Sequence, residues 1–434
     1  MNNLNVSAAA SSVHALEHQL FFVLLQLLII VIVARIAGRL ARKFGQPRAV
    51  GEMIAGLLLG PSLLGHFFPE ASHFLFQSVP PLPVSIISQI GLILLMFQIG
   101  MDFEFSHLAD RRNRRAVSWI SILSIGLPFG LGIGIGVWSA PILAPDVPVL
   151  PYSLFVGVAL SITAVRILGR ILAEYGLTRT HLGAIAISAA AVNDVVGWVL
   201  LAVISSIAVG EFNLLATLAQ LAYLVLYVAV CLLVVRPLLR WLMKKYTFDQ
   251  KRMNGDLMAV MIALVFISAM ATFKIGIFAI FGGFMMGVLV HDNRAFVESW
   301  KNSVGDFVMV FFLPIFFTYS GLRSNIAGLD SLALWAWCFL FLAAATFGKL
   351  GGGYLGGRFG GLSVSESSTI GALMNTRALM ELIVLNIGFD LGFVPRDAFT
   401  MLVIMAIGTT IMTGPALRNR LPRMGYIVPV GVDA

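Results

Sequence analysis

The stretch SAAAVNDVVGWVLL, residues 188–201, carries an asparagine and an aspartate side by side in the middle of an apolar run. Asp194 is the only charged residue between Leu182 and Val209. A charged side chain at the centre of a bilayer-spanning helix costs about 3 kcal/mol on insertion scales, and such residues commonly mark ion pathways. If this run crosses a membrane, Asp194 is therefore a residue with a function.

The composition places the run in a membrane protein. The chain is 59% hydrophobic and 12% charged, whereas soluble domains are about 25% charged. The apolar segments long enough to cross a bilayer, at roughly 17–25 residues each, are 20–38, 49–65, 84–101, 116–139, 152–173, 183–209, 214–241, 256–273, 275–291, 303–321, 332–356, 368–391 and 398–417. We predict an all-α integral membrane protein with about thirteen transmembrane helices.

Basic residues gather in alternate connections between these segments. With the N-terminus outside, the inward connections include RRNRR at 111–115, and the outward connections contain only Lys274, Arg323 and Arg396. Cytoplasmic loops carry such an excess of Lys and Arg. We predict a multi-pass protein of the plasma or inner membrane, with 1–18 outside and a short cytoplasmic tail at 419–434. The net charge of +8 then forms a cytoplasmic girdle beside membrane lipid, and no nucleic-acid partner is expected.

The connections are too short for a soluble domain, so 19–418 is interpreted as one transmembrane unit. No nucleotide-binding domain is expected in this chain, which argues against transport driven by ATP. The sequence contains no His–Glu metal spacing, nucleophile elbow or Gly-rich phosphate loop, which argues against an enzyme. A secondary transporter or a channel remains, and no cofactor is expected beyond the transported ions.

Polar residues lie at membrane depth in four places. They are Asn193–Asp194, then Ser161, Thr163 and Arg166 in LSITAVRILGR (160–170), then Lys349 in ATFGKLGGGYLGG (345–357), and Asn375, Thr376, Arg377 and Glu381 in LMNTRALMELIVLNIG (373–388). Asp194 has no partner at the i±4 positions, and an ionisable residue at this depth is by default a functional one.

Each of the other places also has a structural interpretation. Arg377 and Glu381 stand at i and i+4, which favours an ion pair on one helix. The long side chains of Lys349 and Arg166 are of the kind that snorkels toward water. Serine and threonine at 161 and 163 are of the kind that bonds back to carbonyls one turn earlier.

The segments divide into six, a linker and six more, and the odd offset makes the two halves inverted. The fifth segment of each half is interrupted by polar residues, SITA at 161–164 and MNTR at 374–377. Paired interruptions at corresponding positions indicate a transporter site near the bilayer midplane. Irregular backbone is tolerated at this depth where it lines a cavity. Asp194 would supply the negative charge there, with Asn193 and the backbone around Thr163 as neutral oxygens.

Five motifs in order resemble the monovalent cation/proton antiporters, in the branch of bacterial Na⁺/H⁺ and K⁺/H⁺ exchangers and plant cation/H⁺ exchangers. They are QPRAVGEMIAGLLLGPSLLG (46–65), GLILLMFQIGMDFEF (91–105), ALSITAVRILGRILAEYGL (159–177), AISAAAVNDVVGWVLLA (186–202) and GALMNTRALMELIVLNIG (371–388). The resemblance implies an inverted-repeat fold with two crossing broken helices. It also implies a homodimer, with a dimerisation part at about 19–103 and 256–325. A core part would cover about 116–209 and 332–417, joined by a linker helix at about 214–245.

The resemblance also implies roles for residues. Asp194 falls on the aspartate that carries the ion and the proton, and Asn193 on a neighbour that is a second aspartate in many electrogenic members. Lys349 falls on the core lysine, and 161–164 and 375–377 fall on the crossing unwound stretches. One departure is Arg166, in TAVR, where the family often has proline in TAFP.

The mechanism that we expect is exchange at one carboxylate. Either H⁺ or a monovalent cation, Na⁺ or K⁺, neutralises Asp194, and the neutralised site crosses the membrane. Because Asn193 does not titrate, one H⁺ per cation and an electroneutral cycle are expected. A cation channel is an alternative, since carboxylates and carbonyls also build selectivity filters. A sodium-coupled organic-anion symporter of related fold is another, with Arg166 and Arg377 available to bind a carboxylate.

Overall fold

The computed structural model describes residues 2–102, 113–178, 180–209, 214–245, 253–377 and 379–426, and every regular element in them is a helix. The first half contains α1 (Asn2–Lys43), α2 (Arg48–Leu59), α3 (Leu64–Phe67), α4 (Pro69–Phe76), α5 (Leu82–Met101), α6 (Arg114–Leu143), α7 (Val149–Ser161), α8 (Val165–Glu174) and α9 (His181–Val209). A long helix follows, made of α10 (Leu214–Val230), η2 (Cys231–Val235) and α11 (Arg236–Lys245).

The second half has the same all-helical character. Its elements are α12 (Gly255–Lys274), α13 (Ala279–Val290), α14 (Arg294–Trp300), η3 (Lys301–Gly305), η4 (Val308–Phe312), α15 (Leu313–Arg323), η5 (Ile326–Gly328), α16 (Leu332–Phe359), α17 (Val364–Met374), α18 (Leu379–Asp390), α19 (Arg396–Arg420) and η6 (Pro422–Met424).

The predicted fold class is confirmed. Within the described ranges, nine helices are long and apolar enough to cross a membrane, and two bent pairs of helices pass the same test together. The shorter apolar helices α7 and α13 fall on the predicted segments 152–173 and 275–291. Each predicted segment therefore overlaps a helix, and the protein is a multi-pass membrane protein.

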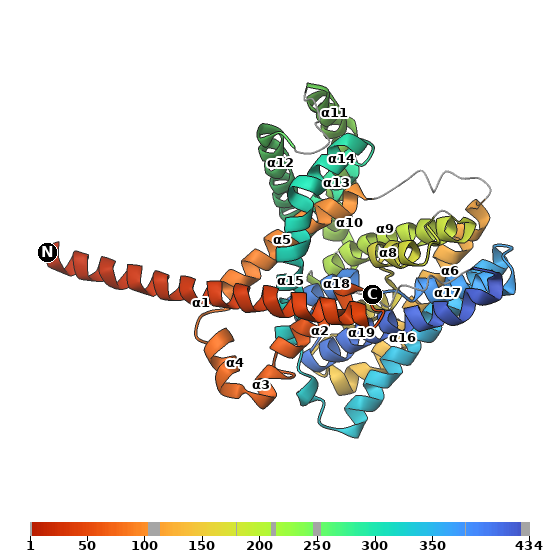
Figure 1. Ribbon diagram of the computed structural model, residues 1–434, viewed down its shortest axis with the longest axis horizontal. Coiled ribbons are helices and arrows are strands. Elements are labelled where there is room, and N and C mark those ends of the chain that lie inside the picture. The colour runs from red at the N-terminus through yellow and green to blue at the C-terminus, as the bar shows by residue number, and fades with distance from the viewer. Residues whose placement is uncertain are drawn as a thin grey trace.

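The helices pack into two groups (Figure 1). The first group contains α1, α2, α5, α12, α13 and α15, which contact one another in series. The second group contains α6–α9 and α16–α19, with the long helix α16 in contact with α6, α7, α17 and α19. The two groups meet along α2, α5 and α15 on one side and α8, α9 and α18 on the other, where residues from both groups line shared cavities.

A glycine stripe explains why α16 lies so close to its neighbours. A Cβ on Gly352 would lie 2.3 Å from the carbonyl oxygen of Leu123 on α6, and a Cβ on Gly356 would lie 2.5 Å from the Ile120 Cα. On the next face of α16, a Cβ on Gly353 would lie 2.7 Å from the Cα of Gly371 on α17. Small residues let helix backbones approach in membranes, where van der Waals packing drives association. This close packing carries Lys349 into the middle of the second group.

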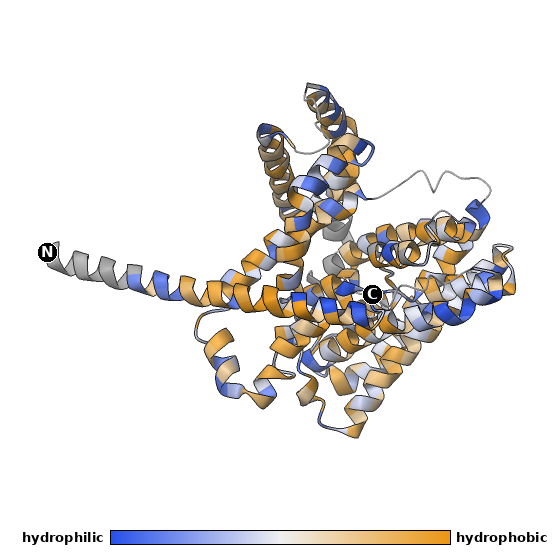
Figure 2. Cartoon of the chain, in the orientation of Figure 1, coloured by the Kyte–Doolittle hydropathy of each residue, from blue (hydrophilic) through white to orange (hydrophobic). Residues whose placement is uncertain are grey.

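Apolar residues predominate along many of the helices (Figure 2), and a number of their large side chains are exposed. Leu24 and Leu28 on α1 are each 57% exposed, and Phe347 on α16 is 71% exposed. These exposed side chains suit contact with lipid tails, since the backbone polar groups are already satisfied inside the helices.

Candidate functional site

Both predicted helix interruptions are present. The helix α7 ends at Ser161 and α8 begins at Val165, with the backbone extended at Ile162 and Ala164. The β-branched residues Ile162 and Thr163 have lower helix propensity than unbranched ones, which favours a break here. In the second half, α17 ends at Met374 and α18 begins at Leu379, and these two helices are bent by 44°.

The two breaks lie against each other. The backbone N–H of Ala164 donates to the carbonyl oxygen of Thr376 over 3.0 Å. The Thr163 hydroxyl donates to the carbonyl oxygen of Met374, one of the carbonyls at the end of α17, over 3.2 Å. The prediction that the two broken helices cross is thus confirmed, and each break satisfies backbone groups that the other leaves open.

Two buried cations hold the end of α7. The Arg377 guanidinium donates to the carbonyl oxygen of Ala159 over 2.5 Å and also to that of Leu160. The Lys349 ammonium donates to the carbonyl oxygen of Ser161. Lys349 and Arg377 are 0% and 1% exposed, so neither snorkels to water. The last carbonyls of a helix carry a partial negative charge and lack partners within the helix, so cations here satisfy both needs.

The hydroxyl of Thr163 gathers three partners. Besides its bond to Met374, it accepts hydrogen bonds from the Lys349 ammonium at 2.7 Å and from the Asn193 amide at 3.3 Å. A hydroxyl has one donor and two acceptor positions, so this one is fully used. The Ser161 hydroxyl instead bonds back to Val158 over 2.9 Å.

Asn193 and Asp194 lie on α9 beside the crossing. Their side chains are 1% and 2% exposed. The Asn193 amide nitrogen donates to the Ser124 hydroxyl on α6 over 2.9 Å as well as to Thr163, while its amide oxygen accepts no hydrogen bond from the residues that the structure describes. Asn193 is thereby held at the first helix break, with its amide oxygen left available among the described residues.

Asp194 forms part of the wall of a cavity between the two groups. This Asp194 cavity has a volume of about 130 Å³. Its walls come from the second group through Asp194, Ala164, Val165, Ile167, Arg170, Leu379 and Met380, and from the first group through Pro47, Ala49, Ile99, Met309, Leu313 and Phe317. A carboxylate at a boundary between two helix groups is accessible to an ion that enters along that boundary.

The remaining predicted site residues lie close by. Arg377 and Glu381 form an ion pair of 3.6 Å on α18 and the break before it, both fully buried. Asn375 donates to the carbonyl oxygen of Thr409 over 3.4 Å, and the Thr376 hydroxyl bonds to Leu373 over 2.8 Å. The backbone of residue 166 belongs to α8, while the side chain of Arg166 lies outside the described residues.

Comparison with known proteins agrees with this architecture. The family model for the transmembrane part of sodium/hydrogen exchangers matches residues 28–419. The chain belongs to this family. It is therefore a cation/proton antiporter, a transporter and not an enzyme. Among its relatives, the chain is 37% identical over 93% of its length to a Na⁺/H⁺ antiporter of Synechocystis, of which it covers 98%.

Other relatives are longer than the chain. It is 36% identical, over 92% of its length, to cation/H⁺ antiporter 17 of Arabidopsis thaliana, and it spans 48% of that protein. A yeast K⁺/H⁺ antiporter is 28% identical, and the chain spans 43% of it. Among solved structures, the sodium proton antiporter MjNhaP1 of Methanocaldococcus jannaschii has a TM-score of 0.67 at 15% identity, covering 94% of this chain and 99% of that one. This likeness shows that the antiporter fold is shared.

Our interpretation of the sequence did not include two buried polar residues of the antiporter, Glu52 and Ser124. Glu52 on α2 is 5% exposed and lies within electrostatic range of Arg35, Arg48 and Arg170, the last of which lines the Asp194 cavity. The same rule that singled out Asp194 applies to Glu52, since it is the only charge in the segment 49–65. Ser124, which holds Asn193, gave no comparable signal because serine is frequent in membrane helices.

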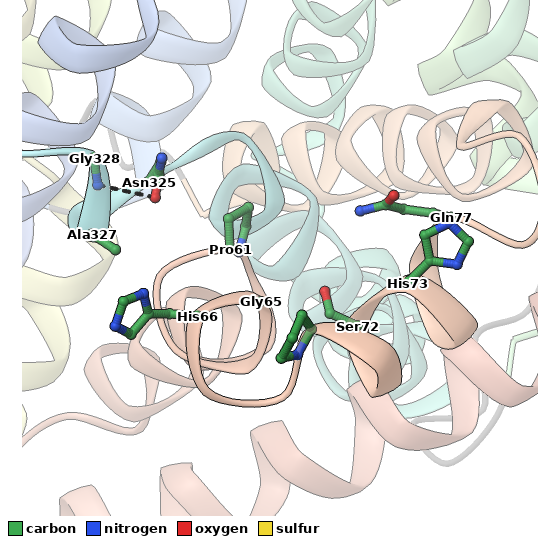
Figure 3. Close-up of a pocket in the computed structure, with 10 residues that line it drawn as sticks. Pro61, Gly65, His66, Ser72, His73, Gln77, Asn325, Ala327 and Gly328 are labelled. Carbon is green, nitrogen blue, oxygen red and sulfur yellow. Dashed lines mark hydrogen bonds between the residues drawn. The ribbon is translucent and has the colours of Figure 1, made fainter.

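A larger cavity lies apart from the site, at the end of α15. It has a volume of about 540 Å³ and lies between α3, α4 and the turn at η5. His66 and His73 are on opposite sides of it and do not converge on a common point (Figure 3). This cavity therefore offers no shared histidine site for a metal ion.

Proposed function

We propose that the antiporter exchanges Na⁺ or K⁺ for H⁺ by alternating access, with Asp194 as the shared site. The observation that carries this proposal is the position of Asp194, buried at 2% exposure yet on the wall of a cavity between two helix groups. Withdrawing a carboxylate from water is costly, and either a proton or a bound cation on Asp194 lowers that cost. Because the two compete for one charge, uptake of one releases the other.

The oxygen atoms beside Asp194 suit an alkali cation. The amide oxygen of Asn193, which accepts no hydrogen bond from the described residues, is a neutral ligand of the hard type that such ions take, one residue from Asp194 in the chain. Ser161 and Thr163 are included in the proposed site because they hold Lys349 and Asn193 around the ion. The supporting charges are Lys349, Arg377 and Glu381, together with Arg166.

Movement of one helix group against the other would expose Asp194 to each side in turn. We propose that the second group is the moving core, about 116–209 and 332–417, and that the first group, about 19–103 and 256–325, forms a homodimer. The separate packing of the two groups supports this division.

The Asp194 cavity would open to the cytoplasm. The predicted orientation has the N-terminus outside and the C-terminus inside, which places the connection between α1 and α2 on the cytoplasmic face. Pro47 from this connection lines the Asp194 cavity, and Arg42, Lys43 and Arg48 lie around it in sequence. The excess of positive charge at this end fits the cytoplasmic side.

We propose an electroneutral cycle of one H⁺ per cation. Position 193 is an amide that donates to two hydroxyls, so it contributes no second titrating carboxylate. Lys349 is bonded to the end of α7 and to Thr163, which favours a structural role over release of its proton in each cycle.

Proteoliposomes test the exchange directly. With the purified chain reconstituted and a pH-sensitive dye inside, addition of Na⁺, K⁺, Li⁺ and Rb⁺ in turn should drive proton movement for at least one of them. A cation current without proton movement would indicate a channel instead. Proton or sodium flux that needs an added organic carboxylate would indicate a symporter.

A further inference from the structure

A second cavity lies between the same two helix groups. It has a volume of about 370 Å³, and its walls include Ser85, Ser88 and Leu92 of α5, Phe316 and Tyr319 of α15, and Ile383, Asn386 and Asp390 of α18. We name it the Asn386 cavity. It shares no lining residue with the Asp194 cavity.

The two cavities occupy opposite ends of one boundary. On α18, Leu379 and Met380 line the Asp194 cavity, while Asn386 and Asp390 line the Asn386 cavity. At 1.5 Å per residue, Met380 and Asp390 stand about 15 Å apart along the helix axis. On α15, Leu313 lines the Asp194 cavity and Tyr319, further along the helix, lines the Asn386 cavity. On α5 the order is reversed, with Ser85 lining the Asn386 cavity and Ile99 the Asp194 cavity. Phe316 lines the Asn386 cavity and its neighbour Phe317 lines the Asp194 cavity, so the lining of α15 changes from one cavity to the other between these two residues.

Arg323, the last residue of α15, joins the two groups at the Asn386 cavity. Its guanidinium donates to the Asn386 side-chain oxygen over 2.9 Å and forms an ion pair of 2.5 Å with Asp390, both on α18. The guanidinium also lies over the ring of Tyr319 at 4.1 Å and over that of Phe389 on α18 at 5.1 Å. The Asn386 amide donates to Ser320 on α15 over 2.7 Å, which adds a second bond between the same helices.

Burial makes this cluster stronger than a surface ion pair. The Arg323 side chain is 13% exposed and Asn386 is 6% exposed, whereas the Asp390 side chain is 43% exposed, so burial strengthens the Arg323–Asn386 bond more than the ion pair. Charge-assisted hydrogen bonds from arginine are roughly twice as strong as neutral ones, and partial burial reduces their screening by salt. Any sliding of α18 along α15 breaks these bonds together.

We propose that Arg323, Asn386 and Asp390 form a latch that closes the boundary at the end opposite the Asp194 cavity. The latch stabilises the arrangement of this structure, in which Asp194 lines the Asp194 cavity, and it must release before Asp194 is exposed to the other side. This inference rests on the alternating-access mechanism proposed above. Since the bonds exist only in one state, their removal shifts the equilibrium toward the other.

Other contacts near Arg323 are less suited to such a role. The Arg396 side chain donates to the Arg323 carbonyl oxygen over 3.2 Å, and the backbone N–H of Asn325 donates to the Thr400 hydroxyl over 3.0 Å. Both lie at the connection 324–331, through which the chain itself passes from α15 to α16. Neither of these bonds, which both end on α19, is an ion pair, whereas the contact between Arg323 and Asp390 joins two charges.

Two cysteine reporters test the latch. In a background with Cys231 and Cys338 replaced by serine, Ser88→Cys reports on the Asn386 cavity and Ala49→Cys on the Asp194 cavity. The protein in nanodiscs is labelled with a charged thiol reagent that reaches both faces. In Asp390→Asn, we expect labelling to rise about tenfold at position 88 and to fall at position 49.

A matched control keeps the test specific. Lys301→Gln removes an ion pair of 2.5 Å between Lys301, at the start of η3, and Asp102, directly after α5. This pair involves neither α15 nor α18, so the substitution should change neither labelling rate. Arg323→Lys keeps the charge but loses the fork geometry and should give an intermediate shift. Unchanged rates in a folded Asp390→Asn variant, or a rise at both positions, would overturn the latch. Labelling does not require transport, so it tests the latch separately from the proposed exchange. If the labelling rates at positions 88 and 49 change in opposite directions, but the protein shows no cation-driven proton movement, the proposed exchange is contradicted and the latch is retained.

Discussion

Lys349 and Asn193 donate hydrogen bonds to the same side-chain hydroxyl, that of Thr163. The Lys349 ammonium donates to the Thr163 hydroxyl over 2.7 Å, and the same hydroxyl accepts from the Asn193 amide at 3.3 Å. The lysine also donates to the carbonyl oxygen of Ser161 at the end of α7. One buried positive charge thus holds the first helix break and orients the residue next to Asp194.

Lys349→Gln should lower stability more than it lowers transport. The glutamine amide is neutral and shorter, so the last carbonyls of α7 lose a cation and a hydrogen bond of the charged type, about 1.5–3 kcal/mol. We expect a lower temperature of thermal unfolding in detergent, with cation-driven proton movement still measurable in proteoliposomes.

The control for this substitution is Lys274→Gln, at the exposed end of α12. It should leave both the unfolding temperature and the transport rate unchanged. Complete loss of transport in Lys349→Gln, with unchanged stability, would make Lys349 a proton carrier and would contradict its structural role.

Gly352→Ala should destabilise the second group, whereas Gly351→Ala should not. A Cβ at 352 would lie 2.3 Å from the backbone oxygen of Leu123, which cannot move without shifting α6, while a Cβ at 351 meets no atom within 4 Å. Overpacking of this kind costs about 1–3 kcal/mol. The measurement is the unfolding temperature of both variants in detergent, and equal temperatures would show that α6 and α16 do not depend on this close approach.

The helix segments and both breaks were predictable from the sequence because their signals are local. Apolar length marks each span, and the polar interruptions at 161–164 and 374–377 mark the breaks. The short helices α7 and α13 were found because the apolar runs continue beyond their helical ends. The ion pair between Arg377 and Glu381 was likewise expected from their spacing and is present at 3.6 Å.

Contacts between distant segments could not be predicted in the same way. The sequence placed Arg323 in a connection on the outer side, but its partner Asp390 is 67 residues further along the chain. Nothing local showed that the Thr163 hydroxyl would receive both Lys349 and Asn193. These bonds depend on how the helices pack, and that packing rests on many weak contacts spread over the chain.

Asp194→Asn should abolish cation-driven proton movement and leave the protein folded. The amide has the same shape and removes the cost of burying a charge, but it cannot bind a proton that it then exchanges for a cation. The assay is dye-reported proton movement in proteoliposomes, with thermal unfolding as the check on folding. Asp256→Asn, on the exposed first turn of α12, serves as the control and should transport normally. Substantial exchange in Asp194→Asn would remove Asp194 from the site.

An imposed membrane potential decides the stoichiometry, and position 193 is where it can be altered. If one H⁺ moves per cation, no net charge crosses, so rate and end point should not follow the potential at fixed ion gradients. Asn193→Asp adds a second carboxylate beside Asp194 and within reach of Thr163, and we expect it to let two protons move per cation. The exchange would then move one net charge in each cycle. A membrane potential of 100 mV changes the free energy of such a cycle by about 2.3 kcal/mol, which shifts the ratio of ion gradients at the end point roughly 50-fold. Asn193→Thr adds no charge and should stay insensitive to the potential. If the unaltered protein responds to the potential, a second group carries a proton in each cycle. The candidate is Lys349, which shares the Thr163 hydroxyl with Asn193.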